Sequence, residues 1–290
     1  MQNPTTIKQL LAEDSPVERH TRQQWLLYCL NQPLGYLISH GDEAVGEAVL
    51  AQYHAGLKKL AQGVPLAYVI GRQAFWRHEF LVNAHTLIPR PDSERLVETV
   101  LKWINNAKNS LSKSNTNSPK QLLDLGTGSG CLAISLALEL PNWHITAVDI
   151  SADALHMAQQ NVTALGANNV TLMQGSWLAA FAGMQPRPQF DVIISNPPYI
   201  AADDPHLPQL HAEPLGALVA ADDGLADIAQ IVTQSRAFLN PQGLLAFEHG
   251  YQQGRAVREL LANSGFHAIQ TVRDYGGNER VTFGTADNNS

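Results

Sequence analysis

The second half of the chain alternates short apolar runs with helical patterns, and this alternation constrains the fold more than any other feature. From Gln121 onward, runs rich in Leu, Ile and Val are separated by segments with helical spacing. Strands that alternate with helices in this way form a mostly parallel sheet. The predicted strands cover 122–125, 145–148, 170–173, 190–194, 244–248, 269–272 and 281–283. The sequence therefore predicts an α/β, Rossmann-like fold with a seven-stranded sheet.

A glycine-rich loop follows the first predicted strand. It reads Gly126-Thr127-Gly128-Ser129-Gly130 and precedes a predicted helix. Glycines let the backbone approach a ligand closely, and a helix N-terminus offers free N–H groups. The spacing Gly-x-Gly-x-Gly differs from the Gly-x-Gly-x-x-Gly of dinucleotide-binding folds, where the third glycine serves helix packing near a pyrophosphate. The loop predicts a cofactor site and favours a cofactor without a phosphate.

A carboxylate ends the second predicted strand, one strand–helix–strand unit after the glycine loop. Asp149 follows the apolar run 145–148. An acidic side chain at this position can accept hydrogen bonds from both hydroxyl groups of a ribose. It could also cap the helix expected near Ser151, and the two roles are compatible.

An aromatic residue follows the third predicted strand. Trp177 closes the loop 174–177, where its indole could cover an adenine base. The alternative is that Trp177 belongs to the hydrophobic core.

A stiff polar turn follows the fourth predicted strand and reads Asn196-Pro197-Pro198-Tyr199. In an open α/β sheet, ligands bind at the carboxyl ends of the strands. Two prolines fix φ and remove two backbone donors, so the Asn196 side-chain oxygen and the Pro197 carbonyl remain as acceptors. The turn suits a substrate that offers N–H groups, beside the flat face of Tyr199. The alternative is an ordinary surface turn.

The first part of the chain contains no ligand motif and is predicted to be helical. Ser15-Pro16 is a candidate helix start, and apolar residues recur at helical spacing over 45–60 before Gly63 and Pro65. We therefore expect residues 1–64 to form an N-terminal helical bundle that recognises the substrate.

A different pattern marks the segment that follows. β-branched and aromatic residues dominate 68–71 and 74–80, with a turn residue between them. This pattern predicts a β-hairpin connector over residues 65–90.

Residues 91–290 are assigned to the α/β domain. Its first helix follows Asp92 and Ser93, either of which could cap it. The Ser-, Asn- and Lys-rich stretch 109–120 has no periodicity and is expected to be a mobile loop.

Composition argues against several classes of function. The formal net charge is -7 at pH 7, so no global attraction draws the chain to nucleic acid, and a protein partner is at least as natural. Cys29 and Cys131 lie outside any metal-ligand spacing and are interpreted as packed free thiols, so no metal site is expected. Neither a secretory leader nor an apolar run of about 20 residues is visible. We expect a cytoplasmic protein without membrane association.

The glycine loop and the Asn-Pro-Pro-Tyr turn together resemble the motifs of class I S-adenosylmethionine-dependent methyltransferases that modify amino groups. Further segments make the chain similar to the PrmC/HemK family along essentially its entire length. These segments are 65–71, 88–94, 213–214, 217–218, 248–250 and 275–280. The resemblance implies a release factor glutamine methyltransferase. One departure lies in the loop 175–177, where many relatives carry an acidic residue and this chain has Ser176.

The resemblance also implies a reaction and roles for residues. The methyl group of S-adenosylmethionine passes to the glutamine amide nitrogen in the Gly-Gly-Gln motif of class 1 peptide chain release factors, and S-adenosylhomocysteine is left. The turn 196–199 holds the acceptor, while the loop 126–130, Asp149, Trp177 and Asn196 hold the cofactor. The Asn196 NH₂ group is expected to face the backbone or the cofactor. The ring face of Tyr199, and not its hydroxyl, is expected to contact the substrate.

Three alternatives are compatible with parts of the pattern. A methyltransferase acting on adenine or guanine amino groups would use the same acceptor turn, with Tyr199 stacked on an extruded base. A noncatalytic adaptor would keep the fold but not need the intact glycine loop and Asn196. A nicotinamide dehydrogenase would share the glycine loop. His249 is interpreted as structural.

Overall fold

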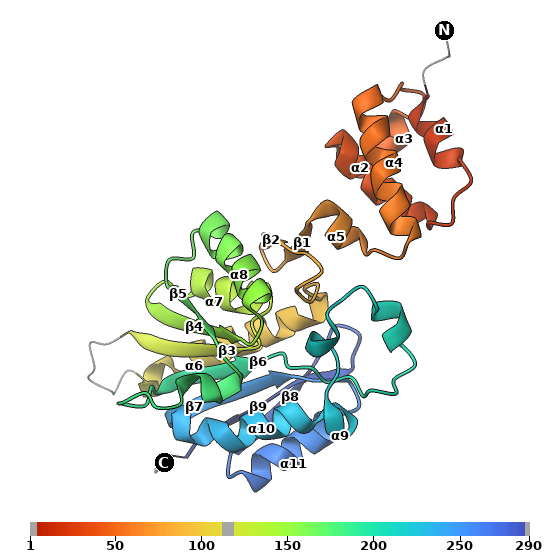
Figure 1. Ribbon diagram of the computed structural model, residues 1–290. Coiled ribbons are helices and arrows are strands. Elements are labelled where there is room, and N and C mark those ends of the chain that lie inside the picture. The colour runs from red at the N-terminus through yellow and green to blue at the C-terminus, as the bar shows by residue number, and fades with distance from the viewer. Residues whose placement is uncertain (1–4, 112–118, 288–290) are drawn as a thin grey trace. The chain divides into compact units, whose positions relative to one another are not determined.

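The computed structural model describes residues 5–111 and 119–287 and divides the chain into two compact units, Met1–Arg72 and Gln73–Ser290 (Figure 1). The predicted loop 109–120 falls mainly on residues 112–118, which lie outside the described part of the chain. The residues before them, up to Leu111, belong to a long helix. Each unit is described by itself.

The first unit is helical. Its helices are α1 (Ile7–Ala12), α2 (Arg19–Leu30), α3 (Tyr36–Ser39), α4 (Glu47–Ala61) and α5 (Leu66–Ile70). Trp25 lies at the centre of their shared core, where its Nε1 donates to the Tyr53 carbonyl at 2.9 Å. A Cβ on Gly56 would lie 2.3 Å from the indole ring, so only glycine lets α4 pass this close to Trp25.

Two predictions about this unit are wrong. The segment 68–71, predicted as β-rich, lies within or directly after α5, because Leu66, Val69 and Ile70 pack against the helical core and Gly71 ends the helix in a left-handed conformation. Ser15-Pro16 does not start α2, which begins at Arg19. The Ser15 hydroxyl instead accepts from the Val17 N–H in a local turn.

The second unit begins with a two-stranded hairpin and continues into a seven-stranded sheet. The hairpin is β1 (Arg72–Phe75) and β2 (His78–Leu81). The sheet strands are β3 (Lys120–Leu125), β4 (Trp143–Asp149), β5 (Val170–Gln174), β6 (Phe190–Ser195), β7 (Leu239–Glu248), β8 (His267–Arg273) and β9 (Glu279–Thr285). They lie in the order β5-β4-β3-β6-β7-β9-β8, and β9 runs antiparallel to both of its neighbours. The predicted mostly parallel, seven-stranded α/β fold is confirmed.

Helices cover both faces of this sheet. They are α6 (Glu94–Leu111), α7 (Cys131–Glu139), α8 (Ala152–Leu165), α9 (Ala221–Gly224), α10 (Ala226–Ser235) and α11 (Gly254–Asn263). Short 3₁₀ turns are η1 (Pro91–Ser93), η2 (Trp177–Phe181), η3 (Leu207–Leu210), η4 (Leu215–Ala217) and η5 (Arg236–Phe238). The strands are apolar on both sides because both of their faces are buried.

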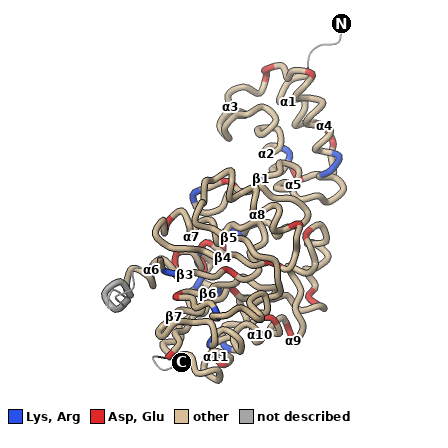
Figure 2. The backbone as a smooth tube through the Cα atoms, turned by 60° about the vertical axis from the view of Figure 1, so that its left-hand side comes forward, with Lys and Arg blue, Asp and Glu red and all other residues tan. Residues whose placement is uncertain are grey.

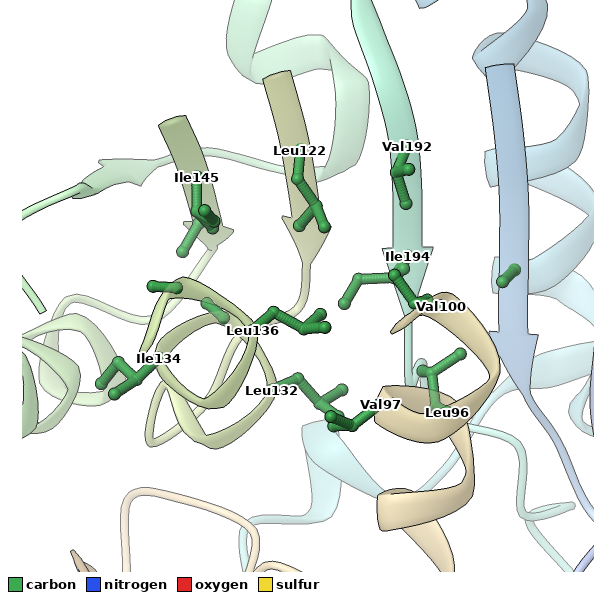
Figure 3. Close-up of a cluster of buried hydrophobic side chains, with 14 of the residues drawn as sticks. Leu96, Val97, Val100, Leu122, Leu132, Ile134, Leu136, Ile145, Val192 and Ile194 are labelled. Carbon is green, nitrogen blue, oxygen red and sulfur yellow. The ribbon is translucent and has the colours of Figure 1, made fainter. Parts of the chain in front are cut away.

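Alternate side chains of each strand enter different cores. Figure 3 shows one face, where β3, β4 and β6 meet α6 and α7. Its labelled side chains are Leu96, Val97, Val100, Leu122, Leu132, Ile134, Leu136, Ile145, Val192 and Ile194. On the other face, Leu123 and Ile193 pack with Ile228 of α10 and Val257 of α11. Each such side chain contributes roughly 1.5–3 kcal/mol by leaving water.

The strand order reverses at β3, because the chain moves outward from β3 to β5 and then returns to the opposite side of β3 with β6. A crevice forms outside the carboxyl ends of the strands at such a switch point, and ligands bind there. The glycine loop follows β3 and the Asn-Pro-Pro-Tyr turn follows β6. The topology thus brings the two predicted motifs to one edge of the sheet.

Asn161 of α8 fixes the hairpin and the glycine loop at this edge. Its Oδ1 accepts from the Leu81 N–H at 2.7 Å, and its Nδ2 donates to the carbonyls of Leu81 at 3.0 Å and Ser129 at 2.9 Å. The side chain is buried, so water cannot replace these bonds.

We expect Asn161→Ala to lower the free energy of unfolding by about 2–4 kcal/mol, because it leaves buried backbone groups without partners. Denaturant unfolding measures the change. Gln160→Ala, on the exposed side of the same helix, is the control and should stay within about 0.5 kcal/mol of the parent. Equal stability of the two variants would contradict the assignment.

Candidate active site

A cavity of about 440 Å³ opens at the carboxyl ends of β3, β4 and β6. Six of the residues that the sequence predicts to bind the cofactor or the substrate line it, namely Gly126, Gly128, Asp149, Trp177, Asn196 and Pro198. Residues from four separate segments of the sequence therefore meet in one place.

The glycine loop presents its backbone to this cavity. Gly126 and Gly128 have φ values of +75° and +56°, which favour glycine, and both line the cavity. A Cβ on Gly128 would meet no atom within 4 Å, so a side chain there would project into open space that a ligand can use. Gly130 differs, because its Cβ would lie 2.9 Å from Ile134 Cδ1, and it serves helix packing.

Thr127 and Ser129 are buried behind the loop and are absent from the described cavity wall. Thr127 Oγ1 donates to Asp124 Oδ2 at 2.7 Å. Asp124 was not predicted as a site residue, although a carboxylate inside the apolar strand Leu-Leu-Asp-Leu was a visible signal. Its Oδ1 has no hydrogen-bond partner among the described residues, and burial raises its pKa to about 7. Through its hydrogen bond with Thr127, this carboxylate stabilises the glycine loop.

Asp149 is held by the backbone around it. Its Oδ2 accepts from the Gly128 N–H at 2.8 Å and its Oδ1 from the Ser151 N–H at 2.9 Å. Ser151, and not Asp149, caps α8, because its hydroxyl accepts from the Ala154 N–H. Burial raises the pKa of Asp149, against the effect of the backbone donors. Each carboxylate oxygen keeps a lone pair for a further donor, so the side chain fits a ribose diol.

The sequence allowed two positions for Trp177, the cavity wall and the hydrophobic core, and its ring contacts both. Its ring packs against the core cluster that contains Phe181, and it also lines the cavity. The ring lies against Gly126, where a Cβ would be 3.0 Å from it. Its Nε1 donates to Asp227 Oδ1 at 3.2 Å, which fixes the indole at the cavity wall.

The acceptor turn is tied into the protein more firmly than the sequence suggested. Asn196 Nδ2 donates to Ser93 Oγ at 3.2 Å, so one N–H of this group is bonded to a side chain, and the expectation that the group faces the backbone or the cofactor stays a prediction for the other N–H. The Tyr199 hydroxyl donates to Glu248 Oε1 at 3.2 Å and burial raises its pKa, so the hydroxyl has a partner of its own. Pro197 and Pro198 are buried.

Ser93 thus bonds to the turn through its hydroxyl. The 3₁₀ turn η1, whose N-cap is Arg90, has no side-chain capping bond, and α6 begins directly after it at Glu94. Asp92, the other predicted cap, pairs with Arg280 at 3.4 Å. Sequence reasoning missed Ser93, Glu248 and Arg280 as neighbours of the site, and only their place in the segments 88–94, 248–250 and 275–280 marked them.

The opposite wall of the cavity is held by an ion pair. Arg90 pairs with Glu213, and Glu213 Oε2 also accepts from the Ile88 N–H at 3.0 Å. Glu213 is buried, so this carboxylate is paired and hydrogen-bonded as a buried charge requires. Leu87 and Pro214, which flank these contacts, line the cavity.

Three further features concern the described chain as a whole. Both cysteines are free thiols, as predicted. Across residues 5–111 and 119–287 there is no cluster of three or more His, Cys, Asp or Glu side chains arranged to hold a metal ion. Within the same residues, no helix has the length and apolar character that crossing a membrane requires.

If Asp149 holds the ribose of S-adenosylmethionine, Asp149→Ala should weaken cofactor binding by about 1.5–3 kcal/mol, because a charged acceptor is lost. Isothermal calorimetry measures the dissociation constant. Asp203→Ala removes the same charge from an exposed loop outside the cavity wall and should leave the constant unchanged. Unchanged binding by Asp149→Ala, with the fold intact by circular dichroism, would refute the assignment.

Comparisons with known proteins concern the chain along most of its length. Residues 116–280 match a family model described as a methyltransferase domain, and residues 5–71 match the PrmC N-terminal domain. The release factor glutamine methyltransferase of Escherichia coli (strain K12) is 41% identical over 280 residues, which are 96% of this chain and 95% of that protein. The protein of the same name from Xylella fastidiosa (strain 9a5c) is 39% identical over 283 residues, 97% and 98% of the two chains.

A solved structure extends the likeness to the fold. The hMettl16 catalytic domain in complex with MAT2A 3'UTR hairpin 1 aligns with a TM-score of 0.55 and 11% identity over 90% of this chain and 91% of that one. At this identity the match shows a shared fold and nothing more. The family models and the two full-length relatives go further, and the chain belongs to the PrmC/HemK family of release factor glutamine methyltransferases.

Proposed function

We propose that this enzyme methylates the side-chain amide nitrogen of the glutamine in the Gly-Gly-Gln motif of class 1 peptide chain release factors. The observation that carries the proposal is the acceptor turn, in which Asn196 Oδ1 makes no hydrogen bond to the described residues and Asn196 lines the cavity beside Gly126 and Asp149. An amide acceptor offers two N–H groups, which match the Asn196 oxygen and the Pro197 carbonyl.

The cavity residues fit the methyl donor of this family. The backbone at Gly126 and Gly128, the Asp149 carboxylate and the Trp177 ring would hold S-adenosylmethionine. When bound, this cofactor supplies an electrophilic methyl group on a sulfonium. The open space at Gly128 and the accepting oxygens of Asp149 are the features of this chain that accommodate it.

The chain's contribution to catalysis is to orient a poor nucleophile. An amide nitrogen shares its lone pair with the carbonyl, and acceptors on both N–H bonds favour electron density on nitrogen. Holding the nitrogen at near-attack distance supplies several kcal/mol without a strong base. We assign no general base. His249 is buried, with its ring nitrogens bonded to Thr282 Oγ1 at 2.8 Å and the Gly250 carbonyl at 2.9 Å, and it serves the structure.

A protein substrate suits this chain better than the runner-up, an adenine or guanine base in nucleic acid. The formal net charge is -7, whereas phosphate backbones require basic surfaces. Figure 2 shows Lys and Arg as short separate stretches among Asp and Glu in the described chain. Release factors act in translation, so we propose a cytoplasmic enzyme with no direct nucleic-acid partner.

The test is to incubate the enzyme with S-adenosylmethionine and a purified class 1 release factor and to map the product by tandem mass spectrometry. We expect one added methyl group on the glutamine of the Gly-Gly-Gln motif. A release factor with that glutamine changed to alanine is the control. Methylation of a nucleic acid, with none of the release factor, would establish the runner-up instead.

Asn196→Ala should lower the single-turnover rate on the release factor by roughly 10²-fold or more, with a smaller change in the Michaelis constant, if the interaction strengthens in the transition state. Asn196→Asp keeps an acceptor but adds a charge and loses the donor to Ser93, and it should also lower the rate. Asn263→Ala, at the end of α11, is the matched control. Near-normal methyl transfer by Asn196→Ala would remove the central assignment.

The N-terminal unit is proposed to recognise the release factor. A chain of residues 73–290 should bind S-adenosylmethionine as tightly as the full chain, because the cavity lining comes entirely from that unit. Its Michaelis constant for intact release factor should rise about tenfold or more. Efficient methylation of intact release factor by the shortened chain would show that the N-terminal unit has another purpose.

A further inference from the structure

The backbone of the acceptor turn is held at its two ends. The two prolines in its middle have fixed φ angles and no backbone N–H, so neither can be held by a bond that its own backbone donates. At the start of the turn, Ser195 Oγ donates to the Leu125 carbonyl at 2.7 Å. At its end, the Tyr199 carbonyl accepts from Gln253 Nε2 at 3.0 Å. Because the middle is stiff, a shift of either end shifts the whole turn.

Gln253, which directly precedes α11, uses both ends of its side-chain amide. Its Nε2 donates to the carbonyls of Tyr199 at 3.0 Å and Asp223 at 2.9 Å, and its Oε1 accepts from the Gly250 N–H at 2.9 Å. Two acceptors at one end and a donor at the other are compatible with only one of the two orientations of an amide. These contacts fix the half-buried side chain, which joins three segments that are distant in the sequence.

A strained segment brings the second carbonyl to Gln253. Asp222 and Asp223 have φ values of +51° and +53°, and Gly224 follows with +82°. This left-handed conformation is costly for a residue with a side chain, and such residues gather at functional sites. A Cβ on Gly224 would lie 2.1 Å from the Tyr199 oxygen, so only glycine lets the segment pass this close to the acceptor turn.

The same segment pairs with the residue that follows the turn. The Ile200 N–H donates to the Leu218 carbonyl at 2.9 Å, and the Ala220 N–H donates to the Ile200 carbonyl at 3.0 Å. Residues 218–224 therefore run along the end of the acceptor turn. Gln253 bonds to both chains at once, through the Tyr199 carbonyl on one and the Asp223 carbonyl on the other.

We propose that Gln253 is a positioning residue for methyl transfer, which clamps the Tyr199 carbonyl against Gly224 and so keeps the acceptor turn aimed at the substrate nitrogen. The inference rests on the proposed function, because the aim matters only when the turn holds an acceptor amide. Gln253 itself is absent from the cavity wall that the described residues form. It acts through the turn, whose Asn196 oxygen and Pro197 carbonyl would accept from the substrate.

The first experiment replaces Gln253 by an isosteric residue that cannot donate. Gln253→Glu keeps the length of the side chain and the acceptor for the Gly250 N–H, but its carboxylate loses both bonds to the carbonyls. Gln252→Ala, at the exposed neighbouring position, is the matched control. Single-turnover methyl transfer to a Gly-Gly-Gln release factor is measured at saturating S-adenosylmethionine, and melting temperature confirms that each variant is folded.

We expect Gln253→Glu to lower the single-turnover rate by about tenfold or more, because transfer requires the nitrogen and the methyl group at roughly 3–3.5 Å. The Michaelis constant for release factor and the cofactor dissociation constant should stay within about twofold of the parent. Gln252→Ala should keep the parental rate. A parental rate in Gln253→Glu, or a rise in the Michaelis constant alone, would overturn the clamp.

The second experiment tests the close contact with Gly224. Gly224→Ala places a Cβ against the Tyr199 oxygen and should lower the same rate by about tenfold or more. Gly183→Ala is the matched control, because Gly183 has nearly the same φ, +81°, and a Cβ there would meet no atom within 4 Å. Both variants carry the same backbone strain, so only the contact differs. Equal rates in the two variants would contradict the role of Gly224.

The third experiment does not depend on activity. The dipeptide Tyr-Ile occurs once in the chain, at 199–200. Protein labelled with ¹³C-carbonyl tyrosine and ¹⁵N-isoleucine therefore gives a single nuclear magnetic resonance cross-peak that joins the Tyr199 carbonyl to the Ile200 N–H. A carbonyl that loses a hydrogen bond moves upfield. We expect Gln253→Ala and Gln253→Glu to move this ¹³C resonance upfield and Gln252→Ala to leave it in place.

The resonance separates the clamp from the proposed function. An unchanged Tyr199 carbonyl resonance in both Gln253 variants would overturn the clamp even if the release factor is methylated. Absence of methyl transfer by the parent enzyme would overturn the proposed function, and the resonance would still show whether Gln253 holds the end of the turn.

Discussion

A buried side-chain hydrogen bond joins the ends of the two strands that carry the glycine loop and the acceptor turn. Ser195 Oγ, at the end of β6, donates to the Leu125 carbonyl, at the end of β3, at 2.7 Å. The next residue on one strand is Asn196 and on the other is Gly126, so this bond sets the distance between the acceptor turn and the glycine loop. Because Ser195 is fully buried, the bond is protected from water and holds both strand ends in register. This bond and the parallel pairing of β3 with β6 together fix the glycine loop beside the acceptor turn.

The features that the sequence predicts well are local. The parallel strands appear as apolar runs because both of their faces are buried. Gly126 and Gly128 mark a loop in the sequence, and the structure gives both of them left-handed φ values. The two prolines of the acceptor turn mark a rigid corner. Asp149 is recognisable because it ends a strand one unit after the loop. Each of these signals is contained in a few consecutive residues, so the edge of the sheet and six residues of the cavity wall could be predicted.

The features that the sequence does not predict are partnerships between distant segments. Ser93 could be interpreted as a helix cap, since nothing near it announces a bond to Asn196. In the same way, Arg90 alone is an ordinary surface charge, and only the folded chain brings Glu213 against it. The error over 66–70 has a related cause, because β-branched residues form a short helix where they pack against the N-terminal core. In each case, contacts between segments that are distant in the sequence determine the structure.

Burial and charge oppose each other at Glu248, behind the acceptor turn. Burial raises the pKa of this carboxyl to about 7 from an ordinary value of 4.5, against the effects of Ser93, Arg280 and Tyr199. A group with a raised folded-state pKa stabilises the fold fully below its unfolded pKa, and this contribution is lost as the pH rises through about 7. The hydrogen bond from the Tyr199 hydroxyl to Glu248 Oε1, in contrast, favours the ionised form. Arg280, which pairs with Asp274 and Asp92, adds a positive charge near the carboxylate, and this charge favours its ionised form.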